Sequence, residues 1–210
     1  MKVYCGSYGF ASRLQHMWER NYGVMLTPAT WKYRNVIKWR YWALDNGAFA
    51  FWNKGQPFDE VNYEYTIREK VPRADSPPDF ITLPDIIAGG EESLRFSMEW
   101  RAKLQDLDHP WYFVVQDGMS TEDVEPIIKD MAGLFVGGTV PWKMKTGESW
   151  VELAHHHGIP CHIGRAGTRR RVLWAKRIGC DSIDSTAFAR EKHGFKKLEG
   201  LDEQMVLVEQ

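Results

Sequence analysis

The feature of this sequence that most constrains its fold is a regular alternation of short apolar runs, rich in β-branched and aromatic residues, with longer amphipathic segments. Eight apolar runs predict strands, at residues 2–5, 24–26, 39–44, 79–83, 111–115, 134–136, 160–163 and 180–183. Five amphipathic segments predict helices, at residues 59–71, 91–107, 121–131, 147–157 and 168–178. Because strands that alternate with helices form parallel βα units, the pattern predicts an α/β protein, a compact (β/α)8 barrel of the TIM type.

The expected helix ends support this division. Ser120 or Thr121 precedes an acidic first turn, and Gly158 and Gly179 are placed to stop two of the helices. The chain has 210 residues, at the lower end of the size range of such barrels, and we find no internal repeat, low-complexity segment or linker. We therefore expect residues 1–210 to form a single domain.

The composition is that of a soluble globular protein. No apolar run approaches the roughly 18 to 20 residues that a membrane span requires, and MKVYCGSYGF at the N-terminus lacks the long apolar segment of a secretory signal, so we expect a cytoplasmic protein without a membrane partner. The cysteines Cys5, Cys161 and Cys180 are too isolated for a zinc ribbon or a disulfide framework and predict buried thiols. The ten tryptophans fit either core packing or stacking on nucleic-acid bases.

Charge is distributed unevenly along the chain, although the net charge at pH 7 is only -1. Residues 59–130 contain 17 acidic and 7 basic residues, residues 164–197 contain 3 acidic and 10 basic residues, and residues 2–40 contain 1 acidic and 7 basic residues. If the two basic ends of the chain meet in a closed barrel, they form one basic face suited to phosphate groups. The same pattern also fits solvated helix faces that have no partner.

Three carboxylates, one amide and several glycines with exposed backbone N–H groups stand just past the ends of most of the predicted strands. They are Asp45 in LDNGAF, Asp85 in LPDIIAGG, Gln116 in VVQDG, Gly137 and Gly138 in FVGGTVP, Gly164 in HIGRAGT and Asp184 in SIDST. In barrels of this type the chemistry sits where strands end and the following loops begin. An ionised group in an apolar run is costly unless it is paired or functional, and this applies above all to Asp184. The set predicts a polar pocket for a planar ligand rich in hydrogen-bond donors.

In order along the chain, these segments resemble the motifs of the tRNA-guanine transglycosylase family, and more closely those of its phage and bacterial relatives that insert 7-deazaguanines into DNA. DNGAF at 45–49 is similar to the family's DSGGF segment, LPD at 83–85 to its base-reading aspartate, and VGG at 136–138 to its VGG turn. Gln116 matches the family's glutamine. GRAGT at 164–168 is similar to its GxGT helix start, and GCDSIDS at 179–185 to its GvDxxDC segment. The resemblance covers about residues 40–190.

The resemblance implies a pentosyltransferase that replaces guanine in DNA by a free 7-deazaguanine base, such as a preQ0-like base, without a cofactor or metal. Asp184 would be the nucleophile that attacks C1′ of the nucleotide, and Asp45 the general acid and base. The implied base-binding residues are Asp85, Gln116, Gly137, Gly138, Asn46 and Phe49. Our candidates for phosphate contacts open the helix after GRAG: Arg165, Arg169, Arg170 and Arg171. Further expected partners are a second copy of the chain or helper DNA-modification proteins, in the host cytoplasm if the protein is phage-encoded.

The chain departs from the family's pattern in several places. Transfer-RNA enzymes of the family carry a cysteine and histidine zinc site near the C-terminus; none is visible here, which together with the short length favours DNA over tRNA. Asn46 stands where the family has serine, and Asp117 follows Gln116 where the family has glycine. After the VGG, TVPWK replaces a small flexible loop, so residues 140–142 are expected to narrow the pocket beside the seven-substituent of the base.

The same residues also admit purely structural roles. Asp45 could form the DNG turn, Asp85 could cap the following helix, and Asp184 could cap a turn through Ser185 and Thr186. The arginines at 169–171 could be an ordinary exposed helix face. These alternatives stay open at the level of the sequence.

The histidines of this sequence do not predict a metal site. Adjacent helix residues point in different directions, so His155, His156 and His157 cannot share one ion, and we expect them to lie at a solvated helix end. His162, at a strand end, is expected to be a core histidine or one that supports a functional residue.

Other function classes fit the same carboxylates. A barrel glycoside hydrolase or phosphate-sugar enzyme could use Asp45 and Asp184 as its pair, and a catalytically inert nucleic-acid-binding relative could retain the fold. A tRNA-directed transglycosylase is the alternative within the same class.

Overall fold

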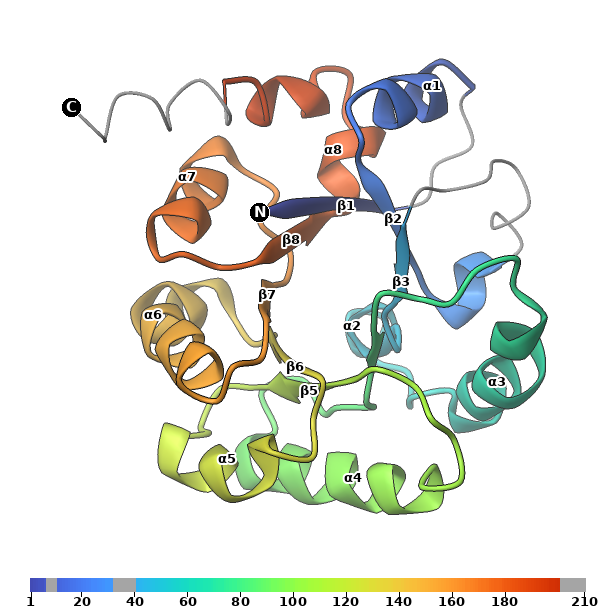
Figure 1. The fold of residues 1–210 in the computed structure, drawn as a ribbon, viewed down its shortest axis with the longest axis vertical. Helices are drawn as coiled ribbons and strands as arrows, with labels where there is room; N and C mark the ends of the chain where they lie inside the picture. The colour runs from blue at the N-terminus through green and yellow to red at the C-terminus, as the bar shows by residue number, and fades with distance from the viewer. Residues whose placement is uncertain (7–10, 32–40, 201–210) are drawn as a thin grey trace.

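The computed structural model describes residues 1–6, 11–31 and 41–200, and its strands form a closed parallel barrel surrounded by helices (Figure 1). The strands are β1 (Lys2–Gly6), β2 (Gly23–Leu26), β3 (Trp42–Leu44), β4 (Ile81–Thr82), β5 (Trp111–Val115), β6 (Gly133–Val136), β7 (Cys161–Ile163) and β8 (Ser182–Ser185). They are hydrogen-bonded in sequence order, and β8 closes on β1, where Tyr4 lies opposite Asp184. The predicted α/β barrel is confirmed; residues 39 and 40 of the third predicted strand lie outside the described residues.

The helices confirm the predicted segments and add three more. They are α1 (Ala11–Glu19), α2 (Ala48–Trp52), α3 (Glu60–Tyr65), α4 (Gly90–Lys103), α5 (Thr121–Ile128), α6 (Val140–His156), α7 (Arg169–Arg177) and α8 (Thr186–Arg190). The segment predicted as one helix at 59–71 is α3, capped by Asp59, followed by a π-helical turn (Thr66–Lys70) and a 3-10 turn (Val71–Arg73). A 3-10 turn, Gly194–Lys197, follows α8. No helix within the described ranges is long and apolar enough to cross a membrane.

Local signals set several of these boundaries. Ser120 caps α5 in a reciprocal capping box with Asp123, as the sequence around it predicts. Gly158 and Gly179 follow α6 and α7 with φ of 69° and 78°, the left-handed conformation that ends a helix.

Helix α6 begins seven residues earlier than predicted, and the reason is a tertiary contact. Gly147, which the sequence favours as a helix start, is buried in the middle of α6. A Cβ atom at this position would lie 2.7 Å from the ring of Trp174 on α7. Glycine at 147 therefore allows α6 and α7 to pack closely and does not mark the start of the helix. The helix begins in the segment TVPWK, with Pro141 in its first turn.

Replacing Gly147 by alanine is expected to lower the free energy of unfolding by about 1 to 3 kcal/mol, because the added methyl group overlaps the Trp174 ring. An exposed helix position responds in the opposite way, since alanine favours the helix. Ser149→Ala, on the exposed face of the same helix, is the matched control and should be neutral or slightly stabilising. Urea unfolding of both variants measures the difference; a stabilised Gly147→Ala protein would show that α7 is free to move away.

The core has two layers, one inside the barrel and one between the barrel and its helices. Inside, the rings of Phe80 and Tyr112 stack at 4.1 Å, and Phe135 stacks on His162 at 4.6 Å. At the mouth where the strands begin, Tyr4 donates to Asp79 at 2.5 Å. The interior is therefore filled by side chains, and only the opposite mouth is left for a pocket.

The outer layer accounts for half of the tryptophans and for all the cysteines. Trp42, Trp100, Trp111, Trp150 and Trp174 are buried, whereas Trp52 is 54% exposed. The three cysteines are free and buried, which confirms that they are core thiols.

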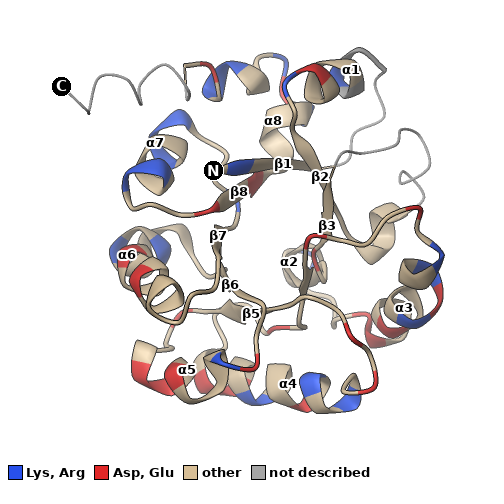
Figure 2. Cartoon of the chain, in the orientation of Figure 1, with Lys and Arg blue, Asp and Glu red and all other residues tan. Residues whose placement is uncertain are grey.

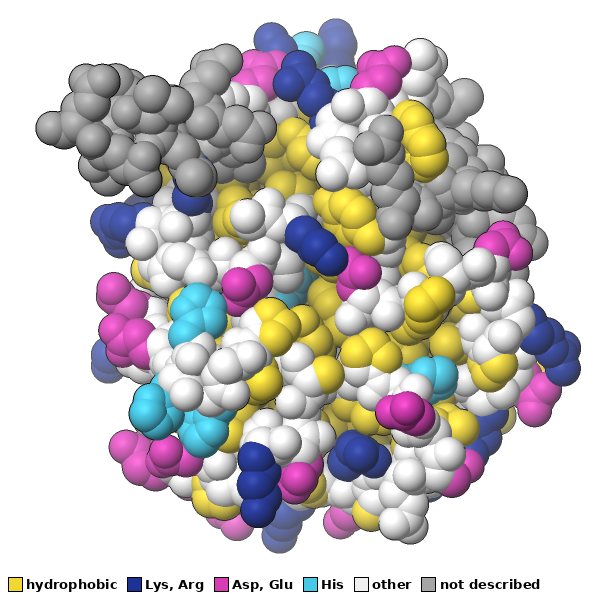
Figure 3. All heavy atoms as spheres, in the orientation of Figure 1, with side chains coloured by type: hydrophobic (Ala, Val, Ile, Leu, Met, Phe, Trp, Pro, Cys, Tyr) yellow, Lys and Arg dark blue, Asp and Glu magenta, His cyan; other side chains and the backbone are white. Residues whose placement is uncertain are grey.

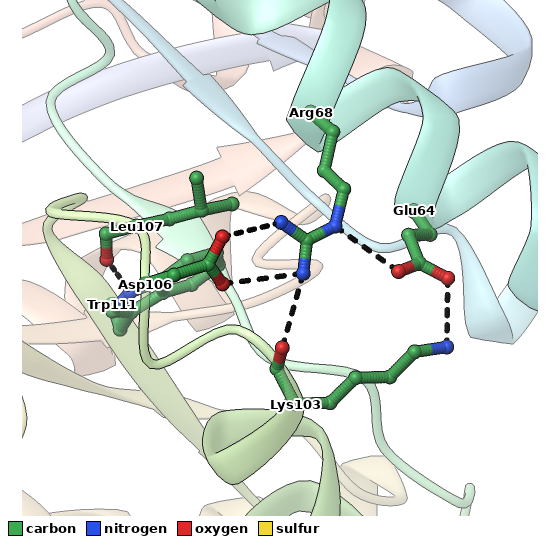
Figure 4. A network of polar contacts seen from close by, with 6 residues as sticks. All are labelled: Glu64, Arg68, Lys103, Asp106, Leu107 and Trp111. Atoms are coloured by element: carbon green, nitrogen blue, oxygen red, sulfur yellow. Dashed lines mark hydrogen bonds and ion pairs between the residues drawn. The ribbon is translucent and has the colours of Figure 1, made fainter.

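An ion-pair network joins α3 to the end of α4 (Figure 4). Arg68 contacts Glu64 at 3.1 Å and both carboxylate oxygens of Asp106, at 2.7 and 3.2 Å, and it donates to the carbonyl of Lys103. Lys103 pairs with Glu64 at 2.7 Å. These groups are partly exposed, so the network fixes the relative position of the two helices more than it adds stability.

The first and last strands, β1 and β8, pair with each other, as the closed barrel predicts. In the ribbon of Figure 2, lysine and arginine positions (blue) gather on α7, and aspartate and glutamate positions (red) on α5. The basic residues within 32–40 lie outside the described residues. Histidine side chains gather over α6 in Figure 3, where His155 bonds Asp181 at 3.0 Å and His157 lies 3.7 Å from Glu125.

Candidate active site

The polar residues predicted to share one mouth of the barrel do so, because all eight strands are parallel. Asp45 follows β3 directly, Asp85 follows β4 after two residues, and Gln116 follows β5 directly. Gly137 follows β6, and Asp184 lies inside β8, one residue before its end. Helix α2 continues from the Asp45 loop and is seen through the ring of strands in Figure 1.

Two adjoining hollows occupy this mouth. The inner hollow, about 380 Å3 with the open space at its mouth included, is lined by Asp45, Asn46, Phe49, Thr82, Asp85, Ile87, Val114, Gln116, Phe135, Gly137, Gly138 and Arg165. The outer hollow is larger, about 1090 Å3, and contains Asp45, Phe49 and Arg165 again, together with Thr168, Arg171, Asp184, Ser185, Thr186, Lys197 and others. Asp45 therefore stands between Asp85 on one side and Asp184 on the other.

A buried amide and carboxylate network forms the floor of the inner hollow. Asp85 accepts from the Asn46 side chain at 2.7 Å and from the Gln116 side chain at 2.5 Å, one to each carboxylate oxygen. The Gln116 oxygen in turn accepts from the backbone N–H of Ala88 at 3.2 Å, which fixes the direction of its amide group. Burial raises the pKa of Asp85 to about 6, although these two hydrogen bonds oppose the rise.

The Asp45 carboxylate stabilises a turn, and its pKa is raised. Its carboxylate accepts from the backbone N–H of Gly47 at 2.6 Å, which is the turn that the sequence DNG predicts. Burial raises the pKa of Asp45 to about 7, and the negative charges of Asp184 and Asp85 add to the rise. The group is therefore poised to give or take a proton near neutral pH.

Asp184 is held through one of its two oxygens. The Oδ1 atom accepts from the backbone N–H of Arg165 at 2.9 Å and lies 3.1 Å from Nε2 of His162. His162 Nδ1 lies 2.8 Å from the hydroxyl of Ser182. No hydrogen bond to Oδ2 of Asp184 comes from any residue that the structure describes. The clamp fixes the carboxylate and leaves Oδ2 for chemistry.

The state of His162 follows from its surroundings. The ring is fully buried, and burial lowers its pKa, so it is neutral near pH 7. Nε2 is the ring nitrogen that faces the Asp184 carboxylate, so the neutral ring carries its proton there and donates it, and Nδ1 then accepts from the Ser182 hydroxyl. His162 thus holds Asp184, which is one of the two roles that the sequence left open for it.

Lys143 is a residue that the sequence analysis missed. It is 2% exposed on α6 and donates to the carbonyl oxygen of Gly164 at 2.5 Å. Burial lowers its pKa to about 7, and the nearby charge of Arg165 acts in the same direction. Nothing in the sequence distinguishes it from Lys145, because the burial comes from the packing of α6 on the loop after β7.

The four arginines divide into two pairs. Arg165, with φ of 55°, places its guanidinium 3.9 Å from the Phe49 ring and donates to the carbonyl of Gly138 at 2.5 Å. Arg171 donates to the carbonyl of Arg165 and also lines the outer hollow. Arg169 and Arg170 are exposed, and Arg169 donates to the carbonyl of Glu199.

The glycine turn after β6 explains two departures from the family pattern. Gly138 has φ of 68°, and a Cβ atom there would lie 2.5 Å from Asp117 and 2.6 Å from Trp142. Asp117 accepts from both the N–H and the hydroxyl of Thr139, so it fastens this loop. Residues 140–142 belong to α6 and line neither hollow, so the expectation that they narrow the pocket is wrong: these residues begin a helix instead of forming a loop over the site.

Two of the structural alternatives are decided by geometry. Asp85 does not cap a helix, since α4 begins at Gly90 and both carboxylate oxygens are bound by side chains. Ser185, not Asp184, caps α8, by accepting from Ala187 N–H at 3.1 Å. In the described part of the chain, no group of three or more histidine, cysteine, aspartate or glutamate side chains is arranged to hold a metal ion.

Comparisons with known proteins add no family name. No protein-family model matches the chain, and no curated protein sequence matches it.

Proposed function

We propose that this protein is a base-exchange transglycosylase that replaces guanine in DNA by a 7-deazaguanine through a covalent aspartyl-glycosyl intermediate. The observation that carries the proposal is the position of Asp45 between the Asp85–Gln116 pair of the inner hollow and Asp184 of the outer hollow. The base would lie in the inner hollow, and its sugar would reach Asp184.

Base recognition would depend on matched donors and acceptors. A guanine-like base presents a ring N–H and an exocyclic amine beside a carbonyl oxygen. The Asp85 carboxylate accepts from the two donors, and the Gln116 amide and the Gly138 N–H donate to the carbonyl. Bases that leave these buried polar groups unpaired would be rejected strongly.

The exchange has two balanced steps. Oδ2 of Asp184 attacks C1′, the C1′–N9 bond breaks with its electron pair moving to the base, and the proton of Asp45 goes to the departing guanine. The incoming 7-deazaguanine then gives its N9 proton to Asp45, attacks C1′, and displaces the Asp184 carboxylate. Two displacements at one carbon give retention of configuration.

The nucleic acid must present the target nucleotide outside a helix, either flipped or single-stranded. Arg171 and Lys197 line the outer hollow, where the phosphates flanking the target would lie. DNA is the proposed substrate and tRNA the alternative; a second copy of the chain and helper proteins remain predictions.

The decisive experiment is mass spectrometry of nucleosides from DNA and, in parallel, from tRNA, each incubated with the protein and 7-cyano-7-deazaguanine. Incorporation into DNA supports the proposal, and incorporation into tRNA alone would transfer the activity to that substrate. Release of guanine without incorporation would identify a hydrolase. Binding without either product would identify an inert nucleic-acid-binding protein.

The rate of exchange is expected to follow a bell-shaped pH profile with its maximum between about pH 6 and about pH 7. Below this range Asp85 takes up a proton and can no longer accept from both donors of the base. Above it Asp45 loses the proton that the departing guanine needs. Steady-state exchange of labelled guanine, measured across this range with the fold monitored by circular dichroism, tests the profile. A rate that stays constant from about pH 5 to about pH 8 contradicts the two assignments.

A further inference from the structure

An exposed pair of aromatic side chains stands beside the two hollows. Phe49 and Trp52 lie one turn apart on α2, with 37% and 54% of their surfaces exposed. Their ring centroids are 5.6 Å apart and the rings are inclined by 32°. Adjacent large aromatic side chains that remain exposed to water are typical of a binding site, so we expect this pair to bind a ligand.

The pair continues a series of planar groups that starts in the hollows. Arg165 lines both hollows, and its guanidinium lies 3.9 Å from the centroid of the Phe49 ring. Phe49 thus has Arg165 as one neighbour and Trp52 as another. Arg165 is itself held by Gly138 and Arg171. Arg165, Phe49 and Trp52 therefore form a ladder of flat faces from the acidic site to the protein surface.

The charges around this ladder favour a polyanion. Arg171 and Lys197 line the outer hollow, where Glu191 pairs with Lys197 at 2.5 Å, and Lys54 is exposed just beyond α2. Flat faces beside cationic side chains are the combination that binds single-stranded nucleic acid, because bases stack on the rings while phosphates meet the cations. Two aromatic side chains offer at most about 500 Å2, less than the roughly 800 Å2 that each partner of a stable protein complex buries.

We propose that Trp52 is a stacking platform for the base next to the target nucleotide, so that the ligand of this mouth is a single-stranded or locally unpaired nucleic acid. The inference rests on the proposed function for the identity of the target, but the platform itself makes a separate claim about binding. The strand would leave the outer hollow, pass over Phe49 and place its neighbouring base on Trp52.

The test is the affinity of the full chain for a fluorescein-labelled single-stranded oligonucleotide that contains one guanine, measured by fluorescence anisotropy at fixed salt concentration. Trp52→Leu, which keeps an apolar side chain but removes the flat face, should weaken binding by about five-fold to about a hundred-fold. Trp52→Phe should restore most of the affinity. Tyr65→Leu, a change of an aromatic side chain that is 53% exposed on α3, is the matched control and should bind like the unaltered protein.

The remaining arms separate this inference from the proposed function. Oligonucleotides of DNA and RNA with the same sequence identify the preferred strand, and a blunt duplex should compete poorly. Equal affinities of Trp52→Leu and the unaltered protein for single strands overturn the platform, even if guanine exchange is observed. If Trp52→Leu binds single strands more weakly but the unaltered protein exchanges no base, the stacking role of Trp52 is supported and the proposed exchange reaction is overturned. A change in sedimentation of Trp52→Leu without a change in nucleic-acid affinity would show that the pair joins two protein chains, which also overturns the inference.

Discussion

Replacing Asp184 by asparagine is expected to reduce guanine exchange by on the order of 10³-fold or more and to abolish the covalent protein–DNA adduct. An amide oxygen can still accept from the Arg165 N–H and from His162, so the clamp and the fold survive. What is lost is the anionic oxygen, to which we assign the attack on C1′. Denaturing gel electrophoresis after incubation with DNA detects the adduct, and labelled-guanine incorporation measures the rate.

The chain offers a close control for this change. Asp181, three residues earlier in the same apolar run, accepts from the backbone N–H of Cys161 at 2.7 Å and contacts His155. Asp181→Asn should therefore keep exchange within a few-fold of the unaltered rate. An Asp184→Asn protein that still forms the adduct would assign the nucleophile to another side chain; Asp45 and Glu191 are the other carboxylates that line this hollow.

Replacing Asp45 by asparagine is expected to have opposite effects on activity and stability. Exchange should fall by about 10² to 10⁴-fold, because no group remains to move the proton of the base. The free energy of unfolding at pH 8 should rise, by about 1 to 4 kcal/mol, because the folded protein no longer holds a buried negative charge beside Asp85 and Asp184.

The sign follows from the raised pKa of Asp45. The folded protein binds this proton up to about pH 7, whereas the unfolded chain releases it near pH 4. As the pH rises between these values, the free energy of unfolding of the unaltered protein falls, because only its unfolded state has lost this proton; Asp45→Asn has no such loss. The stability difference should be absent below about pH 4 and complete above about pH 7. Urea unfolding at several pH values measures it, with the exposed Asp75→Asn as control; a less stable Asp45→Asn protein at pH 8 would mean that the native site favours the charged carboxylate.

Much of the barrel could be predicted from residue patterns because most of its elements are long enough to show their period. The runs that become β5 and β6 and the amphipathic segments of α4, α5 and α7 lie close to their predicted positions. Helix α2 has five residues, too few to show a period, and it was not predicted; the apolar run at 79–83 was predicted as a strand, but only two of its residues form β4. Their existence depends on the strands and loops packed around them.

The candidate site divides in the same way. Position after a strand was enough to select Asp45, Asp85 and Gln116, since parallel strands bring their carboxyl ends to one mouth. It could not select Lys143, which lies on a helix, nor decide which of the arginines at 165–171 face the hollows. The raised pKa values of Asp45 and Asp85 depend on burial, and that of Asp45 also on the nearby charges of Asp184 and Asp85; the spacing of residues along the chain gives neither burial nor these distances.

The sequence by itself predicted the eight strands, the five longer helical segments and the edge at which the acids gather, because hydrophobic period and turn chemistry act over a few residues. Only the tertiary structure decided that one oxygen of Asp184 is tied and the other is open, that Gly147 serves Trp174, and that Arg165, Phe49 and Trp52 form a ladder. These features arise between residues far apart in the chain, where close packing and desolvation set which groups meet.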